Sequence, residues 1–138
     1  MTKPSPIALV VCDNVYREAG GKTALVGLFN RIVANRIPVT HPQLCVYAAV
    51  TDTRPGTRFR IVVEHGETGE VVAELQGPPP EKAGPTTICD FVFVLRGLKF
   101  PKPGTYFIQF WGNEHLLLQR PFEVEQLKRE EKPDDAAS

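Results

Sequence analysis

Serine is almost missing from this chain of 138 residues, because it occurs only at Ser5 and Ser138. Both serines fall in terminal segments, outside every apolar run of the sequence. A catalytic serine must instead be held beside a base by a rigid scaffold. The near absence of serine therefore excludes a Ser-His-Asp hydrolase.

Cysteine is also scarce, with three residues at Cys12, Cys45 and Cys89. Each lies inside an apolar run, and no CxxC pair or neighbouring histidine gives metal-ligand spacing. We predict that all three are buried small hydrophobic residues and that the protein holds no metal or other cofactor. The odd number indicates a reducing compartment, and the apolar stretch 7–11 is too short for a secretory signal, so we predict a cytoplasmic protein.

Long apolar runs and an excess of charge of either sign are missing too. No run approaches the length needed to cross a bilayer. Sixteen basic side chains balance sixteen acidic ones, whereas a protein that binds phosphate backbones usually has a positive field. We therefore expect neither a membrane nor a nucleic acid as a partner.

Catalytic and phosphate-binding motifs are absent as well. Gly21, Lys22 and Thr23 match the last three letters of the phosphate-binding loop GxxxxGK[ST], but Tyr16 stands where that motif has its first glycine. The three histidines, His41, His65 and His115, share no short metal-binding spacing, so we expect them to be scattered on the surface. Asp13, Lys22 and His41 are the best candidates for an active site, yet they suggest no reaction type. We predict that the protein is not an enzyme.

Short runs of apolar and β-branched residues, separated by Gly, Pro, Asp and Asn, are the strongest feature that is present. This pattern is typical of antiparallel sheets. We predict an all-β fold, an antiparallel two-sheet sandwich of immunoglobulin-like or C2-like type with about seven to eight strands. The predicted strands are 7–16, 22–29, 43–51, 58–65, 70–76, 86–95, 105–112 and 115–124.

Three segments do not fit the strand pattern. Residues 30–35 can extend a strand past a bulge or form one helical turn. Residues 77–85 contain four prolines and two glycines, so we predict an exposed connection there. We assign residues 1–124 to a single β-sandwich domain and residues 125–138 to a charged C-terminal tail that we expect to be disordered.

The turn that leads into the strand 105–112 has the sequence Pro103-Gly104-Thr105-Tyr106. It resembles the Pro-Gly-x-Tyr entry of many immunoglobulin-like sandwiches, in which the tyrosine packs inward and hydrogen-bonds the backbone of the corner. We expect Tyr106 to do the same.

Several short motifs in the N-terminal third occur together. They are Cys12-Asp13, Gly21-Lys22, Gly27-Leu28-Phe29, Pro38 and His41-Pro42, followed later by Pro103-Gly104-x-Tyr106. On these residues the chain resembles a family of short bacterial β-sandwich proteins catalogued only as a domain of unknown function. The resemblance spans most of residues 7–124. It implies a single small bacterial sandwich domain and no established activity, cofactor or catalytic residue.

Several predicted strands are apolar on both faces, although a two-sheet sandwich has only one interior. In 86–95 the outward set includes Val92 and Val94, and in 105–112 it includes Phe107 and Trp111. Exposed together, these four side chains would form a patch of the kind usually found at contact sites. We therefore predict a homo-oligomer or a protein partner at this face. The alternative is that residues 30–42 fold over it.

Two carboxylates, Asp13 and Asp90, interrupt apolar strands. Each can face solvent, cap a turn or pair with a buried arginine.

Our leading hypothesis is thus a non-enzymatic bacterial β-sandwich that acts as an interaction or assembly module through an exposed apolar sheet face. The alternative hypothesis is a small-ligand or carbohydrate-binding module. Its candidate contacts are Tyr47, Trp111 and His115, because aromatic planes suit sugar or ring stacking.

Overall fold

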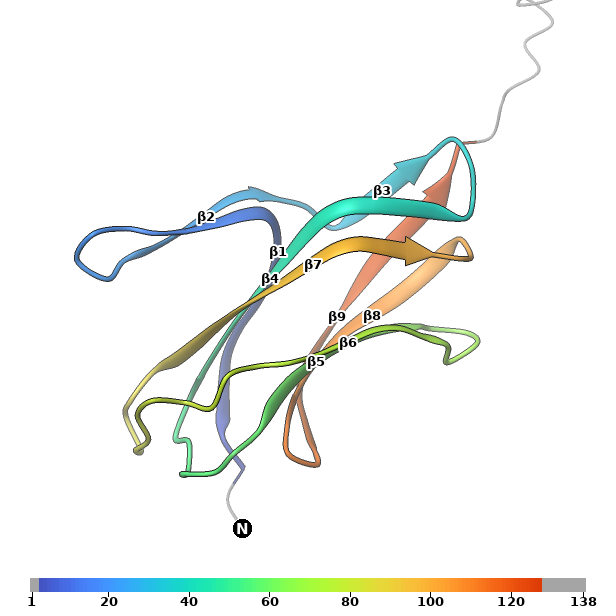
Figure 1. Cartoon of the computed structure of the whole chain (residues 1–138). Coiled ribbons are helices and arrows are strands. Elements are labelled where there is room, and N and C mark those ends of the chain that lie inside the picture. Colours follow the sequence, from blue (N-terminus) through green and yellow to red (C-terminus); the bar gives the residue numbers. More distant parts are fainter. Residues whose placement is uncertain (1–2, 128–138) are drawn as a thin grey trace, which may run out of the picture.

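The computed structural model describes residues 3–127 and contains nine β-strands in two stacked sheets (Figure 1). The first sheet has four strands in the order β2 (Thr23–Leu28), β1 (Ser5–Arg17), β4 (Val39–Thr51) and β7 (Cys89–Phe100). The second sheet has five strands in the order β3 (Arg31–Ala34), β9 (His115–Gln126), β8 (Gly104–Gly112), β5 (Phe59–His65) and β6 (Val71–Gln76). The predicted all-β two-sheet sandwich is confirmed.

The strand missing from the sequence prediction is β3, which falls in the ambiguous segment 30–35. It pairs in parallel with β9, from Arg31 opposite Glu123 to Ala34 opposite Gln126. Every other strand pair among the described residues is antiparallel. The segment 30–42 therefore belongs to the second sheet and the start of β4, and it does not fold over the outer face of the first sheet.

The core lies between the sheets and is rich in aromatic rings. Alternate residues of the facing strands point inward, as the period of a half-buried strand requires. The rings of Phe59 and Phe110 are stacked at 5.5 Å between centroids, and Phe91 packs on Phe59 at 4.8 Å. Towards the other end, Phe100 meets Tyr106 edge-on at 5.0 Å. Aromatic rings are the largest of the side chains that are fully buried between the sheets.

Strand β1 changes partners along its length. It pairs with β4 from Ser5 to Cys12, and with β2 from Cys12 to Arg17. Beyond Cys12, β1 no longer pairs with β4, and the β1–β2 hairpin projects from the rest of the sheet as an arm (Figure 1). We call residues 13–28 the arm.

The corner before β8 has the predicted geometry. The Tyr106 ring is fully buried. Its hydroxyl donates to the Lys102 carbonyl at 2.6 Å and accepts from the Lys102 N–H at 3.3 Å.

At the C-terminal end, β9 continues to Gln126, two residues beyond the predicted domain boundary at 124. Most of the predicted tail, residues 128–138, lies outside the described residues. Within residues 3–127 no helix has the length and apolar character needed to span a membrane.

Candidate interaction surface

The four residues predicted to form one interface patch lie on different sheets. Val92 and Val94 are in β7 of the first sheet, whereas Phe107 and Trp111 are in β8 of the second. All four side chains point away from the core, and the outer faces of two stacked sheets look in opposite directions. The prediction of a single patch is therefore wrong, because sequence alternation gives the face of each strand but not the sheet to which it belongs.

The outer face of the second sheet is a polar network around Trp111. The Arg60 guanidinium lies over the indole ring at 4.7 Å from its centroid. The indole N–H donates to Gln109 Oε1 at 3.0 Å, and Gln109 Nε2 donates to Glu64 at 3.0 Å. Within the chain, the face of the Trp111 ring therefore already contacts Arg60, and its N–H is already hydrogen-bonded to Gln109.

The three predicted ligand contacts do not converge. Tyr47 lies on the outer face of the first sheet and Trp111 on that of the second. His115 is exposed at the start of β9, beside a hollow lined by residues of the 54–57 loop. The hollow beside His115 is lined by neither Tyr47 nor Trp111.

Strand β7 forms one edge of the first sheet. Its register with β4 and its alternating burial place Cys89, Phe91, Phe93 and Leu95 inward. The outward residues are Asp90, Val92, Val94 and Arg96. Val94 is 38% exposed. The candidate surface is built around this strand.

Asp90 anchors the arm to β7. Arg17 Nη1 lies 3.1 Å from Asp90 Oδ2, and the Tyr47 hydroxyl donates to the same oxygen at 2.9 Å. Because Arg17 is in the arm, this contact carries the arm across the outer face of β4. Burial, followed by the hydrogen bond to Asp90, raises the pKa of Tyr47 to about 12. Asp90 thus pairs with an arginine, as one of the alternatives had it, but the Arg17 side chain is 50% exposed and not buried.

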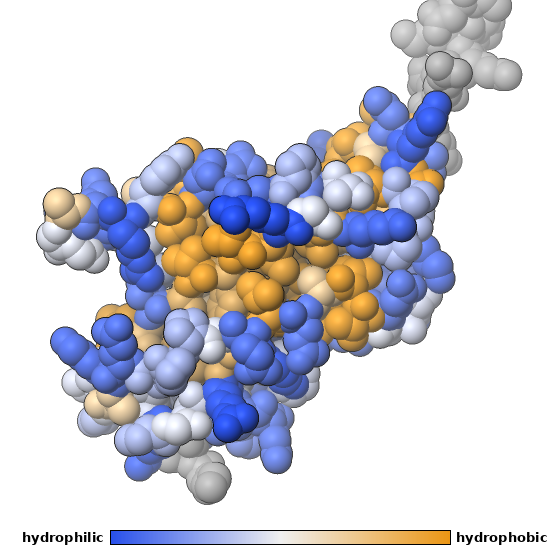
Figure 2. Space-filling view, in the orientation of Figure 1, coloured by the Kyte–Doolittle hydropathy of each residue, from blue (hydrophilic) through white to orange (hydrophobic). Residues whose placement is uncertain are grey.

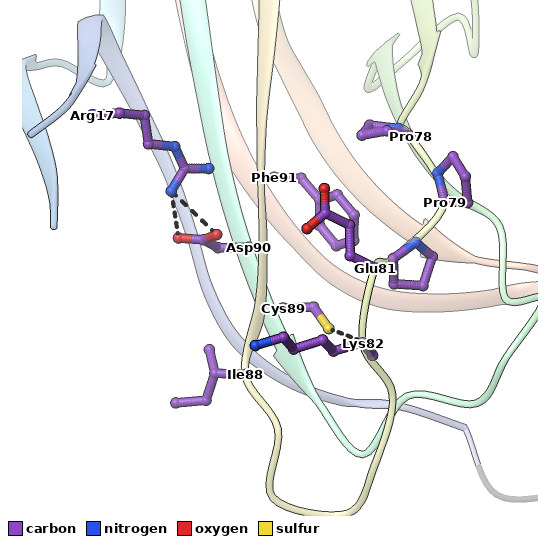
Figure 3. A pocket seen from close by; sticks show the side chains of 10 residues that line it. Arg17, Pro78, Pro79, Glu81, Lys82, Ile88, Cys89, Asp90 and Phe91 are labelled. Carbon is purple, nitrogen blue, oxygen red and sulfur yellow. Dashed lines mark hydrogen bonds and ion pairs between the residues drawn. The ribbon is translucent and has the colours of Figure 1, made fainter. Parts of the chain in front are cut away.

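A hollow lies beside the first half of β7 (Figure 3). It is lined by Arg17 from the arm, by residues 78–82 of the proline-rich connection and by residues 88–91. The Cys89 thiol donates to the Lys82 carbonyl at 3.1 Å. This bond ties the proline-rich connection to the core side of β7.

An apolar groove lies beside the second half of β7, where the edge of the first sheet passes over the edge strand β6 of the second. Figure 2 shows apolar side chains gathered across this region. The lining residues are Val72, Ala73 and Leu75 of β6 with Val94, Leu95, Arg96, Gly97, Leu98 and Lys99 of β7. Here the layer between the sheets reaches the surface. We call this groove and the free edge of β7 the edge surface.

The cysteines are free and buried, as predicted. Cys12 and Cys45 lie opposite each other on β1 and β4. Burial raises the pKa of both thiols. Among residues 3–127, no group of three or more His, Cys, Asp or Glu side chains is placed to hold a metal ion.

The sequence did not predict the arm. It also did not predict the contact between Arg17 and Asp90, or the groove. The signal available for Asp90 was a lone carboxylate in an apolar strand. Nothing in the spacing pointed to Arg17, which lies 73 positions earlier.

Comparisons with known proteins identify a family and a fold. The model of a family described as a family of unknown function (DUF6941) matches residues 7–125. Among curated proteins no sequence matches the chain.

Two solved structures are similar in fold. One is the Pseudomonas fluorescens alkylpurine DNA glycosylase AlkC bound to DNA containing an abasic site analog, with a TM-score of 0.50 and 10% identity over 70% of this chain. This chain spans 28% of the length of that glycosylase. The other is an immunoglobulin-like protein from Pseudomonas aeruginosa, with a TM-score of 0.49 and 11% identity over 90% of this chain and 98% of that one.

Proposed function

The chain belongs to a family of unknown function, DUF6941, and from its own surface we propose that it is a non-enzymatic assembly module that self-associates through the edge surface. The observation that supports this proposal is the apolar groove at the open side of the sandwich (Figure 2). Soluble proteins rarely leave a contiguous apolar area uncovered unless it meets a partner.

The exposure of individual side chains supports the same surface. Leu75, which lines the groove, is 36% exposed although its partner in β5, Ile61, is fully buried. A residue on the inner face of an edge strand is normally covered by the opposing sheet. Covering by a second molecule would remove this apolar area from water.

The alternative of a small-ligand or carbohydrate site receives no comparable support, since Tyr47, Trp111 and His115 lie apart. We do not extend the DNA binding of the glycosylase to this chain, because its basic and acidic side chains balance at sixteen each. We also propose a cytoplasmic setting, for which the free buried cysteines are the support, and a bacterial source, for which the support is the resemblance of the sequence to a family of short bacterial proteins.

A matched pair of leucine variants tests the proposal. Leu75 and Leu116 are similarly exposed, at 36% and 39%, but Leu116 lies in β9, away from the groove. We expect Leu75→Glu to weaken self-association at least tenfold in sedimentation velocity, because a charge in the groove opposes desolvation. Leu116→Glu should leave it unchanged. Equal behaviour of the two variants, or a wild-type protein that is monomeric at every concentration, would refute the proposed function.

A further inference from the structure

Strand β7 is the longest free edge in the part of the chain that the structure describes. Four strands lie at sheet edges, β2, β3, β6 and β7. The first three have six, four and six residues, whereas β7 has 12. An edge strand presents unpaired backbone N–H and C=O groups that can template another strand.

The prolines, lysines and bulges that usually protect such an edge are missing from the first half of β7. No proline occurs in the strand, and Asp90 is the only charged residue between Cys89 and Leu95. Natural proteins normally place prolines, lysines or bulges on an exposed edge to prevent pairing. An unprotected edge of this length suits a strand partner.

The outward side chains of β7 are complementary to themselves. In order along the strand they are Asp90, Val92, Val94 and Arg96. When a second copy of the strand runs antiparallel, with Phe93 opposite its own counterpart, Asp90 faces Arg96 of the second copy and Val92 faces Val94. The symmetry of the pair repeats each contact. Sliding the copies by two residues either way puts Asp90 opposite Val94 or Leu98 instead, so one register matches the charges.

We propose that two copies of this chain pair through their β7 edges in this register, and that the two first sheets join into one continuous eight-stranded sheet. This inference rests on the proposed function and names its partner, a second copy. Arg96 is exposed, and its Nε donates to Gln43 Oε1 at 3.3 Å, so the contact with the second copy would use the other N–H groups of its guanidinium. Asp90 already accepts from Arg17 and Tyr47, and a carboxylate has further lone pairs for the Arg96 guanidinium.

The two hollows beside β7 fit the same arrangement. One is lined by residues 88–91 and the other by residues 94–99. In the proposed register, the part of the second strand beyond Phe93 runs along residues 88–91, where the hollow of Figure 3 leaves room beside the proline-rich connection. The second copy also covers the apolar groove, because that groove opens on the same edge.

Charge reversal on β7 tests the register. Arg96→Glu places a carboxylate opposite Asp90 of the second copy at both symmetric contacts. We expect the dissociation constant of the dimer, measured by sedimentation velocity on the full chain, to rise about tenfold. Lys22→Glu is the control, since it makes the same change in net charge at an exposed position in the turn of the arm, outside the edge surface. An Arg96→Glu variant that associates like the control would overturn the proposal.

Mixing two variants gives a sharper test. Asp90→Arg alone places two arginines opposite each other and should also weaken the dimer. In a mixture of Asp90→Arg with Arg96→Glu, each contact becomes an opposite-charge pair, so we expect a heterodimer close to wild-type affinity. Circular dichroism checks that Asp90→Arg remains folded, because the substitution removes the partner of Arg17. No recovery on mixing two folded variants contradicts the register.

Amide exchange on the wild type gives a readout that needs no variant. The amides of residues 92–96 should exchange more slowly as concentration rises, while those of β2, another edge, should not change. Slower exchange in β6 with none in β7 overturns edge pairing. The two proposals separate clearly: weakening by Leu75→Glu without any effect of Arg96→Glu keeps the assembly function and removes the β7 register.

Discussion

The hydroxyl of Tyr106 joins the corner before β8 to the strand that follows it. It donates to the Lys102 carbonyl at 2.6 Å and accepts from the Lys102 N–H at 3.3 Å. Tyr106→Phe keeps the buried ring and removes both bonds, so we expect the free energy of unfolding to fall by about 1 kcal/mol. Urea denaturation measures it, with Tyr16→Phe as the control because Tyr16 is 55% exposed in the arm. Equal losses in the two variants would show that the corner bonds contribute nothing.

The phenol of Tyr47 makes the free energy of unfolding decrease as the pH rises into the alkaline range. Burial, and then the hydrogen bond to Asp90, raises its pKa from 10.0 to about 12 in the folded chain. Between these values the unfolded chain releases the phenol proton while the folded chain retains it, so stability falls as pH rises. We expect wild type to be more stable than Tyr47→Phe below pH 10, and the difference to narrow towards pH 12. Urea denaturation at stepped pH measures this, and a constant difference would contradict the assignment.

Single residues differ in how far the sequence predicts them. Tyr106 was predictable, because its partner lies four positions away within one short motif. His65 was expected among scattered surface histidines, but it is 5% exposed. Its Nδ1 accepts from the backbone N–H groups of Glu67 and Thr68, and its Nε2 lies 3.0 Å from the Pro103 carbonyl. That last partner comes from another strand connection, which local sequence does not reveal.

At the scale of elements, the arm depends on a close approach between its two strands. Gly27 has φ +75°, and a Cβ there would lie 3.1 Å from Asp13 Cβ and closer still to its carboxylate. Gly21 has a similar φ of +87° at the hairpin turn, but a Cβ there would have nothing within 4 Å. Alanine substitutions at the two positions therefore separate the cost of backbone strain, which both share, from the cost of crowding against Asp13, which only Gly27 has.

We expect Gly21→Ala to cost about 1 kcal/mol from backbone strain alone. Gly27→Ala should cost about 1 kcal/mol more, since Asp13 must also move. Thermal denaturation, together with amide exchange in β2, reports both effects. If the two variants lose the same stability, crowding by Asp13 is negligible and the arm tolerates a side chain at position 27.

Elements with local partners were predictable, and those with distant partners were not. The hairpin predicted from 58–65 and 70–76 is present as β5 and β6, because alternation and a short glycine-containing loop define it locally. Strand β3 has four residues and pairs in parallel with β9, some ninety positions later. A strand of four residues is too short to show the alternation of apolar and polar residues by which a strand is predicted. Its partner β9 is free on that side until Glu123, which explains how Pro121 fits within it.

At the scale of the whole molecule, the sequence predicted that some apolar side chains would face outward, but not how the surface would divide. Assigning Val92 and Phe107 to opposite sheets requires the strand order, which depends on pairings between distant segments. The arm, which carries Arg17 to Asp90, likewise arises from a bend that alternation does not encode. The candidate groove emerges only when β6 and β7, edges of different sheets, are brought together.

Because Val92 and Val94 lie on one sheet, and Phe107 and Trp111 on the other, substitutions on the two sheets should affect self-association differently. Val94 lies at the edge surface, whereas Phe107 lies on the outer face of the second sheet, opposite Glu64 of β5. Val94→Arg should weaken self-association at least tenfold, because the charge must be desolvated opposite Val92 of the second copy. Phe107→Arg should leave association unchanged, since the new guanidinium stays in solvent beside Glu64.

Light scattering over a concentration series compares the two arginine variants under the same conditions. Both substitutions add one positive charge to an outward apolar position, so a general effect of net charge would weaken association equally. A loss confined to Val94→Arg assigns association to the edge surface. If only Phe107→Arg weakens association, the contact between copies lies instead on the outer face of the second sheet. The second copy would then pack beside the Trp111 ring, or the ring would have to separate from the Arg60 guanidinium to contact it.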